Sequence, residues 1–264
     1  MSESVILAGA CTPSGDLFAG LGALNAVTLG ALIIEGALDR AGVSAGEVDY
    51  VITGQEQARR TARGARIPDR VPAVSVSGAR LCGLNAIALA DRLIRSGEGD
   101  VVVVGGVDPG GVRSMRCSGT PDPCLAGGPP RRADCAVAVV LMRRTRADRL
   151  GLPWLARVGA HSAVTGSAGS SCAGAVRAIR QALLAVPATP RDLRFVDVRQ
   201  TSLMTGADPA PAPPSAVASA FDTTGVRTVL RLAQTLARKG GGMGAAGIWG
   251  DHRAEAVIVC ARTR

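Results

Sequence analysis

The chain alternates between two hydrophobic patterns. In the first, apolar residues recur every three or four positions, which predicts helices over 29–41, 84–94, 175–184 and 226–237. In the second, apolar residues follow one another without alternation, which predicts strands over 5–9, 50–53, 100–106, 134–142, 155–159, 194–198, 242–249 and 254–260. Continuous apolar strands between helices are typical of sheets covered on both faces. We therefore expect an α/β protein.

The same order of elements occurs twice along the chain. A helix, an acidic or proline-containing turn and a strand fill residues 27–54, and the same series fills residues 173–200. A helix followed by a glycine-containing strand fills residues 84–106, and this pair returns in residues 226–250. Each series also opens and closes with an apolar strand. The order therefore indicates a duplicated α/β unit.

The duplication predicts two halves, residues 1–150 and residues 151–264, with a seam near residues 151–153. Each half supplies one sheet, and two sheets that share central helices form a five-layered α-β-α-β-α sandwich. Two stretches rich in glycine or proline, residues 105–132 and residues 207–214, are expected to be loops.

The net charge of +9 comes almost entirely from arginine, because Lys239 is the only lysine. A basic chain of this kind is a candidate for binding nucleic acid or a phosphorylated ligand, or it simply has an arginine-rich solvated surface. The arginines are scattered, and aromatic residues make up only 2% of the chain, so few side chains can stack on bases. We expect no nucleic-acid partner.

No apolar run reaches the roughly 18 residues that a membrane-spanning helix needs. The first four residues lead directly into an apolar strand and lack the basic start of a secretory signal. We therefore expect a cytoplasmic protein without a membrane segment. Its seven cysteines are predicted to be free thiols, and Cys117 and Cys124 have no second pair with which to bind zinc. No metal is expected.

Residues 71–90 (VPAVSVSGARLCGLNAIALA) predict a strand, a sharp turn and a helix. A helix N-terminus at such a turn stabilises a thiolate, so a nucleophile is expected there. Arg80 occupies the turn, and Cys82 follows two residues later. Cys82 is either a relocated nucleophile or a small buried residue, and the sequence leaves both interpretations open.

Three segments resemble the thiolases, the acetyl-CoA acetyltransferase family. They are residues 5–15 (VILAGACTPSG), residues 41–55 (AGVSAGEVDYVITGQ) and residues 83–97 (GLNAIALADRLIRSG). The last is similar to the helix that follows the family's nucleophile. The resemblance extends over most of the chain and implies the thiolase fold with two duplicated halves. It does not by itself imply activity.

The resemblance also implies where the reacting groups should lie, and this sequence departs from the family there. Aligned through Gly83, the family's nucleophilic Cys falls on Arg80 and the following Ser on Cys82. The family's Asn-Glu-Ala-Phe motif falls on residues 199–202 (RQTS), and its Gly-His-Pro motif falls near residues 218–220 (ASA). Its second Cys falls on or near Trp249. Claisen chemistry needs a thiolate, its base and donors for the enolate oxygen, so the departures predict little residual activity.

Four side chains at these degenerate positions are candidate site residues. Arg80 is a candidate for binding a carboxylate or phosphate, or else it reaches solvent or a nearby Asp. Ser219 and Trp249 stand where the family binds substrate, and we expect Trp249 to fill space that substrate has vacated. His252 is a weak candidate for a base and is otherwise a surface residue. His161 is expected to be structural.

We therefore expect a pseudoenzyme, a degenerate thiolase-like protein that works by binding. The resemblance implies a dimer formed through residues 73–77, either a homodimer or a heteromer with an active thiolase or ketosynthase. The insertion that covers coenzyme A in the family is reduced here to residues 105–132, so we expect no cofactor and leave binding of a coenzyme A thioester open. The alternative is an acyltransferase or thioesterase that uses Cys82.

Overall fold

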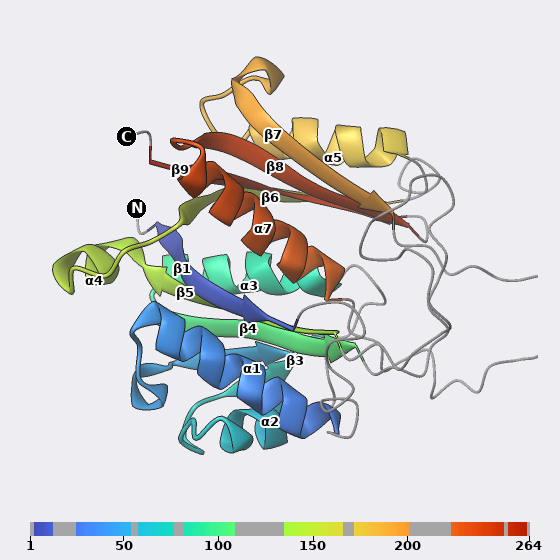
Figure 1. The fold of residues 1–264 in the computed structure, drawn as a ribbon. Helices are drawn as coiled ribbons and strands as arrows, with labels where there is room; N and C mark the ends of the chain where they lie inside the picture. The colour runs from blue at the N-terminus through green and yellow to red at the C-terminus, as the bar shows by residue number, and fades with distance from the viewer. Residues whose placement is uncertain are drawn as a thin grey trace, which may run out of the picture.

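One β-sheet of nine strands runs through the computed structural model (Figure 1). Its strand order is β3-β2-β4-β5-β1-β6-β9-β8-β7. The strands are β1 (Ser4–Cys11), β2 (Tyr50–Thr53), β3 (Ala73–Ser75), β4 (Val101–Asp108), β5 (Cys135–Arg143), β6 (Ala156–Thr165), β7 (Leu193–Gln200), β8 (Gly242–Gly250) and β9 (Arg253–Ala261). The strands β1 to β5 form one half of the sheet and β6 to β9 the other.

The structure describes residues 3–12, 25–53, 58–76, 82–108, 135–165, 172–200, 223–250 and 253–262. Its α-helices in these ranges are α1 (Ala26–Ala41), α2 (Ala58–Gly64), α3 (Cys82–Ser96), α4 (Arg144–Arg149), α5 (Cys172–Leu183) and α7 (Thr224–Arg238). Two short 3₁₀-helices, η3 (Ala45–Glu47) and η6 (Pro190–Asp192), lead into β2 and β7. Within the described ranges, no helix has the length and apolarity required to cross a membrane.

The helices form three layers with the two half-sheets between them (Figure 1). α1 and α2 cover the outer face of the first half, α5 covers the outer face of the second, and α3 and α7 pack together in the middle. The three largest apolar cores of the described residues follow these layers, and the central core takes side chains from both halves. The predicted five-layered α-β-α-β-α sandwich is therefore confirmed. One feature was not foreseen: Val5 and Ile6 pair with Arg157 and Ala156, which makes the two sheets continuous.

The predicted helices and strands are present, and most of their ends lie within three residues of the expected positions. β6 is the exception, because it continues to Thr165 past the predicted end at residue 159. The loop expected over residues 105–132 begins too early, since β4 continues through Gly105 to Asp108. The rest of that stretch, and residues 207–214, lie outside the described residues. The short arginine-rich helices α2 and α4 were not predicted, because one or two turns carry little periodicity.

Local sequence sets the ends of α1. The Asn25 side chain accepts a hydrogen bond of 2.9 Å from the backbone N–H of Thr28, which caps the helix N-terminus. Gly42 ends the helix with φ of 65°, a left-handed conformation that favours glycine. The chain then continues through η3 into β2.

Candidate functional site

The N-termini of α3 and α7 lie side by side, on the same side of the molecule as the carboxyl ends of β2 and β4 (Figure 1). Gly225, at the start of α7, permits this approach. A Cβ atom at this position would lie 2.7 Å from the backbone nitrogen of Leu84 and 3.0 Å from Cα of Gly83. Both helices direct the positive end of their dipoles to this region.

Gly225→Ala is therefore expected to lower the free energy of unfolding by about 1 to 3 kcal/mol, because the added methyl group meets backbone atoms that have no room to move. Gly46→Ala is the matched control, since a Cβ atom there meets nothing within 4 Å. Urea denaturation of both variants measures the difference. Equal stability of the two variants would contradict the close packing of the two helix ends.

A polar cluster lies against the first turns of α3. Asn85 of α3 donates a hydrogen bond of 2.8 Å from Nδ2 to Oε1 of Glu255, which lies on β9. Nε of Arg253 lies 2.7 Å from the same carboxylate oxygen, and its Nη2 lies 3.4 Å from Oδ1 of Asn85. We call Asn85, Arg253 and Glu255 the Glu255 cluster. It joins the two halves of the molecule, because Asn85 lies 170 residues before Glu255 in the sequence.

Glu255 is an unusual residue for the middle of a strand. It is 2% exposed and lies between Ala163 of β6 and Ile248 of β8. Burial raises the pKa of Glu255 from 4.5 to about 7, although Arg253 and Asn85 act in the opposite direction. The carboxyl group can therefore gain or lose a proton near neutral pH, a property that is common among functional acids and bases.

Cys82 is the first residue of α3 and is 1% exposed. Its side chain lies in the central core together with apolar residues such as Ile52 and Leu84. Asn85 follows one helical turn later, so Cys82 and the Glu255 cluster are neighbours along α3. The structure thus places Cys82 at the predicted helix N-terminus and beneath the surface. Reaction with a substrate would require this turn to open.

Trp249 is half-buried near the end of β8 and packs in the outer core beneath α5. Its neighbour Ile248 belongs to the central core and pairs with Glu255. Because side chains alternate along a strand, Trp249 and Glu255 lie on opposite faces of the sheet. The structure therefore does not bring Trp249 together with the Glu255 cluster.

The other candidate residues, Arg80, Ser219 and His252, lie outside the described residues. Arg199, on which the resemblance is expected to place the first position of the family's amide motif, lies on β7. It donates a hydrogen bond of 2.8 Å from Nε to Oδ1 of Asp197. This contact holds Arg199 at the sheet edge.

His161 lies on β6, where its Nε2 is 2.5 Å from Nη2 of Arg92 on α3. Burial and the Arg92 guanidinium lower the pKa of His161, so the ring is neutral at pH 7 and accepts this hydrogen bond. The contact links α3 to the second half of the sheet, and it supports the prediction that His161 is structural.

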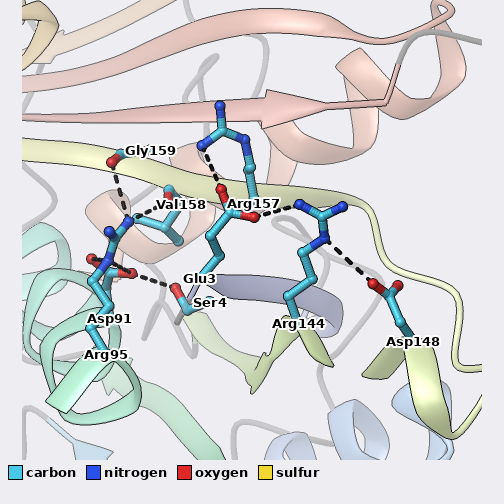
Figure 2. A network of polar contacts seen from close by, with 9 residues as sticks. All are labelled: Glu3, Ser4, Asp91, Arg95, Arg144, Asp148, Arg157, Val158 and Gly159. Atoms are coloured by element: carbon cyan, nitrogen blue, oxygen red, sulfur yellow. Dashed lines mark hydrogen bonds and ion pairs between the residues drawn. The ribbon is translucent and has the colours of Figure 1, made fainter. Parts of the chain in front are cut away.

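A second polar network lies at the opposite end of α3 (Figure 2). Asp91 and Ser4 are both buried, and the Ser4 hydroxyl donates a hydrogen bond of 2.5 Å to the Asp91 carboxylate. Arg95 binds Asp91 and also donates hydrogen bonds of 3.0 and 3.3 Å to the carbonyl oxygens of Val158 and Gly159. This network connects β1, α3 and β6.

Glu3 extends the network towards α4 (Figure 2). Its carboxylate binds Arg144 and Arg157, and Arg144 also pairs with Asp148 at 3.4 Å. The hydrogen bond from Arg144 contributes most to lowering the pKa of Glu3. The contacts hold the first residues of β1 at the point where the two half-sheets meet, so the network has a structural role.

Sequence analysis missed both polar groups. The available signal for Glu255 was one acidic residue inside an otherwise apolar strand, and the signal for Asp91 and Arg95 was their i,i+4 spacing. Neither signal identifies the residue with which the side chain pairs.

Within the described ranges, no group of three His, Cys, Asp or Glu residues could hold a metal, and Cys11, Cys82, Cys172 and Cys260 are free thiols.

The sequence and the fold of this chain are similar to those of known proteins. Residues 4–118 match the thiolase N-terminal domain. The N-terminal part of the chain is therefore similar in sequence to the thiolases. A probable acetyl-CoA acetyltransferase from Mycobacterium tuberculosis is 48% identical over 114 residues, which are 40% of this chain and 29% of the relative. An acetyl-CoA acetyltransferase from Syntrophomonas wolfei is 34% identical over 117 residues, 41% of this chain and 30% of that protein. The chain thus aligns with under a third of these relatives' length.

The thiolase fold extends over the whole chain. Human mitochondrial 3-ketoacyl-CoA thiolase, solved in complex with CoA, superposes with a TM-score of 0.72 over 99% of this chain and 98% of that one. The sequence identity is 17%, so this likeness concerns the fold. Cys82 and Asn85 lie within the matched thiolase domain, whereas Arg253 and Glu255 lie outside it. The Glu255 cluster therefore joins the part of the chain that matches the thiolase N-terminal domain to a part outside that match.

Proposed function

We propose that this thiolase-like chain acts by binding, as a non-catalytic partner subunit. The observation that carries the proposal is the first turn of α3, where the family places its nucleophile. The described thiol in this turn, Cys82, is 1% exposed and packed in the central core. Beside it, Asn85 is bonded to Glu255 and Arg253 within the protein, so its amide is not presented to a substrate.

The sequence supports the same proposal. Arg80 stands at the position of the family's nucleophile, residues 218–220 replace its histidine motif, and Trp249 stands near its second cysteine. Catalytic groups that act as a unit lose almost all activity when one is removed, so loss of several leaves little turnover. A catalytic thiolase would also need a site for coenzyme A, whereas a subunit that acts only by binding needs no such site.

Purified protein incubated with acetyl-CoA, or with acetoacetyl-CoA and coenzyme A, is expected to show no turnover above the uncatalysed rate. These substrates are chosen because the relatives are named acetyl-CoA acetyltransferases. An active acetyl-CoA acetyltransferase assayed in parallel serves as the control. Turnover at the rate of that control would overturn the proposal.

Acyl transfer or thioester hydrolysis through Cys82 is a second candidate function. Glu255 favours it, because a carboxyl group with a pKa of about 7 lies next to the turn that carries the thiol. Incubation with acetyl-CoA followed by mass spectrometry would then detect an acyl adduct that is lost in Cys82→Ser. Cys11→Ser and Cys172→Ser are controls for two thiols that are exposed among the described residues. Absence of an adduct on Cys82 rejects this candidate.

As a partner subunit, the chain would associate through β3, the strand at one edge of the sheet. Its partner would be a second copy or an active thiolase or ketosynthase. Val74 is 38% exposed at this edge, which leaves an apolar side chain available for contact. Sedimentation of the purified chain distinguishes a monomer from a homodimer.

A further inference from the structure

A pocket of about 470 Å³ lies over β1, between the two helices that flank this strand in Figure 1, α1 and α7. β1 pairs with β6 only at Val5 and Ile6, where the backbone N–H of Leu155 also bonds to the carbonyl of Ile6 at 2.8 Å. Residues 153–155 precede β6 and leave the sheet here, so no described strand pairs with residues 7–9 of β1 on that side. The junction of the two half-sheets therefore opens into a cavity of the size that small molecules occupy.

Most of the pocket is apolar, and its shape is fixed. Leu7 and Leu155 line it, and Trp154 forms one wall. The Trp154 ring is held by residues that do not line the pocket. Its Nε1 donates a hydrogen bond of 3.1 Å to Oδ1 of Asp148, and the Arg262 guanidinium stacks 4.3 Å from the ring centre. The wall is therefore in place before a ligand binds, which lowers the entropic cost of binding.

Two polar side chains border the apolar part, and we call the whole cavity the Arg40 pocket. Arg40, in the last turn of α1, donates a hydrogen bond of 3.1 Å from Nη1 to the carbonyl oxygen of Gly9, which holds its guanidinium at the pocket. A guanidinium has five N–H donors, and no carboxylate of a described residue pairs with Arg40. Gln234 of α7 is half-buried, and its side-chain amide makes no hydrogen bond to a described residue. The pocket thus offers one positive charge and one amide to a polar group of a ligand.

A second hollow, of about 400 Å³, also borders Trp154 but lacks this property. It is lined by Asp148 and Arg262, which already form an ion pair of 3.1 Å. Charges that neutralise each other give little preference for an ionised ligand. Of the two hollows, the Arg40 pocket is therefore the one suited to an anion.

We propose that the Arg40 pocket binds a small monocarboxylic acid, whose carboxylate pairs with Arg40 and whose apolar part lies against Trp154. Among the described residues that line the pocket, Arg40 alone is charged. One guanidinium matches the single charge of a carboxylate, whereas a phosphate dianion needs further charge and donors. The Gln234 amide is available to donate a second hydrogen bond. Burial of the apolar part against Leu7, Trp154 and Leu155 supplies the remaining affinity.

This pocket is separate from the candidate functional site. Gln234 lies about 13 Å along α7 from Gly225, at 1.5 Å per residue. No member of the Glu255 cluster lines the pocket. The inference therefore does not depend on the proposed function, and the assay with acetyl-CoA tests that function separately.

Three probes of similar shape test the preference for a carboxylate: 3-phenylpropanoate, 3-phenylpropanol and 3-phenylpropylamine. Ligand-observed NMR titration of the purified chain at pH 7 is expected to give a Kd at or below about 1 mM for the carboxylate. The alcohol and the amine should bind at least about fivefold more weakly. The difference between the carboxylate and the alcohol should shrink at about 0.5 M salt, because screening weakens the contact with Arg40.

Two variants locate the site. Arg40→Met keeps an apolar stem and removes the charge, so 3-phenylpropanoate should bind at least about fivefold more weakly while 3-phenylpropanol binds as before. Gln234→Glu adds a negative charge to the pocket, so it should weaken binding of the carboxylate and strengthen binding of the amine. Arg191→Met, on an exposed residue of η6, is the matched control and should bind all three probes like the wild type. Circular dichroism checks that each variant is folded.

The inference is overturned if the alcohol or the amine binds as tightly as the carboxylate, or if 3-phenylpropanoate does not bind at about 10 mM. It is also overturned if the folded pocket variants bind the carboxylate like the wild type. Equal weakening by Arg191→Met has the same consequence, since the carboxylate would then contact surface arginines in general. Should Arg40→Met fail to fold, Gln234→Glu decides the outcome alone.

Discussion

Asp91→Ala is expected to lower the free energy of unfolding by about 3 to 5 kcal/mol, the largest effect of any single substitution considered for this chain. Asp91 is 4% exposed and accepts hydrogen bonds from Ser4 and Arg95 (Figure 2). Without its carboxylate, the largely buried Arg95 guanidinium loses its counter-charge, and the buried Ser4 hydroxyl loses its acceptor. Both groups then carry desolvation costs that no new bond offsets.

Urea denaturation at pH 7 measures this effect. Asp69→Ala is the matched control, because Asp69 pairs with Arg63 at the surface, where both side chains are more than 60% exposed. That control is expected to cost far less than Asp91→Ala, because ion pairs at the surface contribute little to stability. The double variant Asp91→Ala/Arg95→Ala should cost less than the sum of the single variants, because it leaves no unpaired guanidinium. Additive losses, or a loss no larger than the control's, would show that the network does not stabilise the junction of the half-sheets.

Glu255→Gln is expected to remove a pH dependence of stability worth about 2 to 3 kcal/mol between about pH 5 and pH 8. The pKa of Glu255 is raised from 4.5 to about 7 in the folded chain, so the folded state binds the proton more tightly than the unfolded state does. The resulting stabilisation is fully present below pH 4.5, and it is lost as the pH rises to about 7. Glutamine keeps the shape of the protonated side chain and does not titrate.

The measurement is the difference in the free energy of unfolding between wild type and variant at several pH values. Taking the difference cancels the titration of the other carboxyl groups. The free energy of unfolding of the variant should therefore rise relative to that of the wild type as the pH rises. Most of this change should occur below pH 7. Glu98→Gln, on an exposed carboxylate after α3, should follow the wild type throughout. A constant difference for Glu255→Gln would mean that its carboxyl titrates alike in the folded and unfolded chains.

Much of the fold could be predicted from the sequence because its signals are local. Runs such as Val101–Val104 are fully buried, and the spacing of apolar residues in α3 and α7 matches the faces that enter the central core. The repeated order of elements then indicated two halves and five layers. The short helix α2 and the second half of β6 were missed, because their residues are only partly apolar and owe their conformation to neighbouring elements.

The candidate site was predicted only in part. Sequence placed Cys82 at a helix N-terminus, and the structure has it there. The burial of that thiol follows from packing, which a linear motif does not encode. The same is true of the position of Trp249 on the opposite face of the sheet from Glu255. The roles proposed for Arg80, Ser219 and His252 stay predictions, since these residues lie outside the described part of the chain.

By itself, the sequence determined the alternation of helices and strands and their duplication, because each depends on residues close together in the chain. Only the tertiary structure decided which polar residues share a buried environment. Asn85 meets Glu255 from 170 residues away, and Ser4 meets Asp91 from 87 residues away. The physical reason is that burial and electrostatics depend on distance in space, and folding brings these side chains together from distant positions in the sequence.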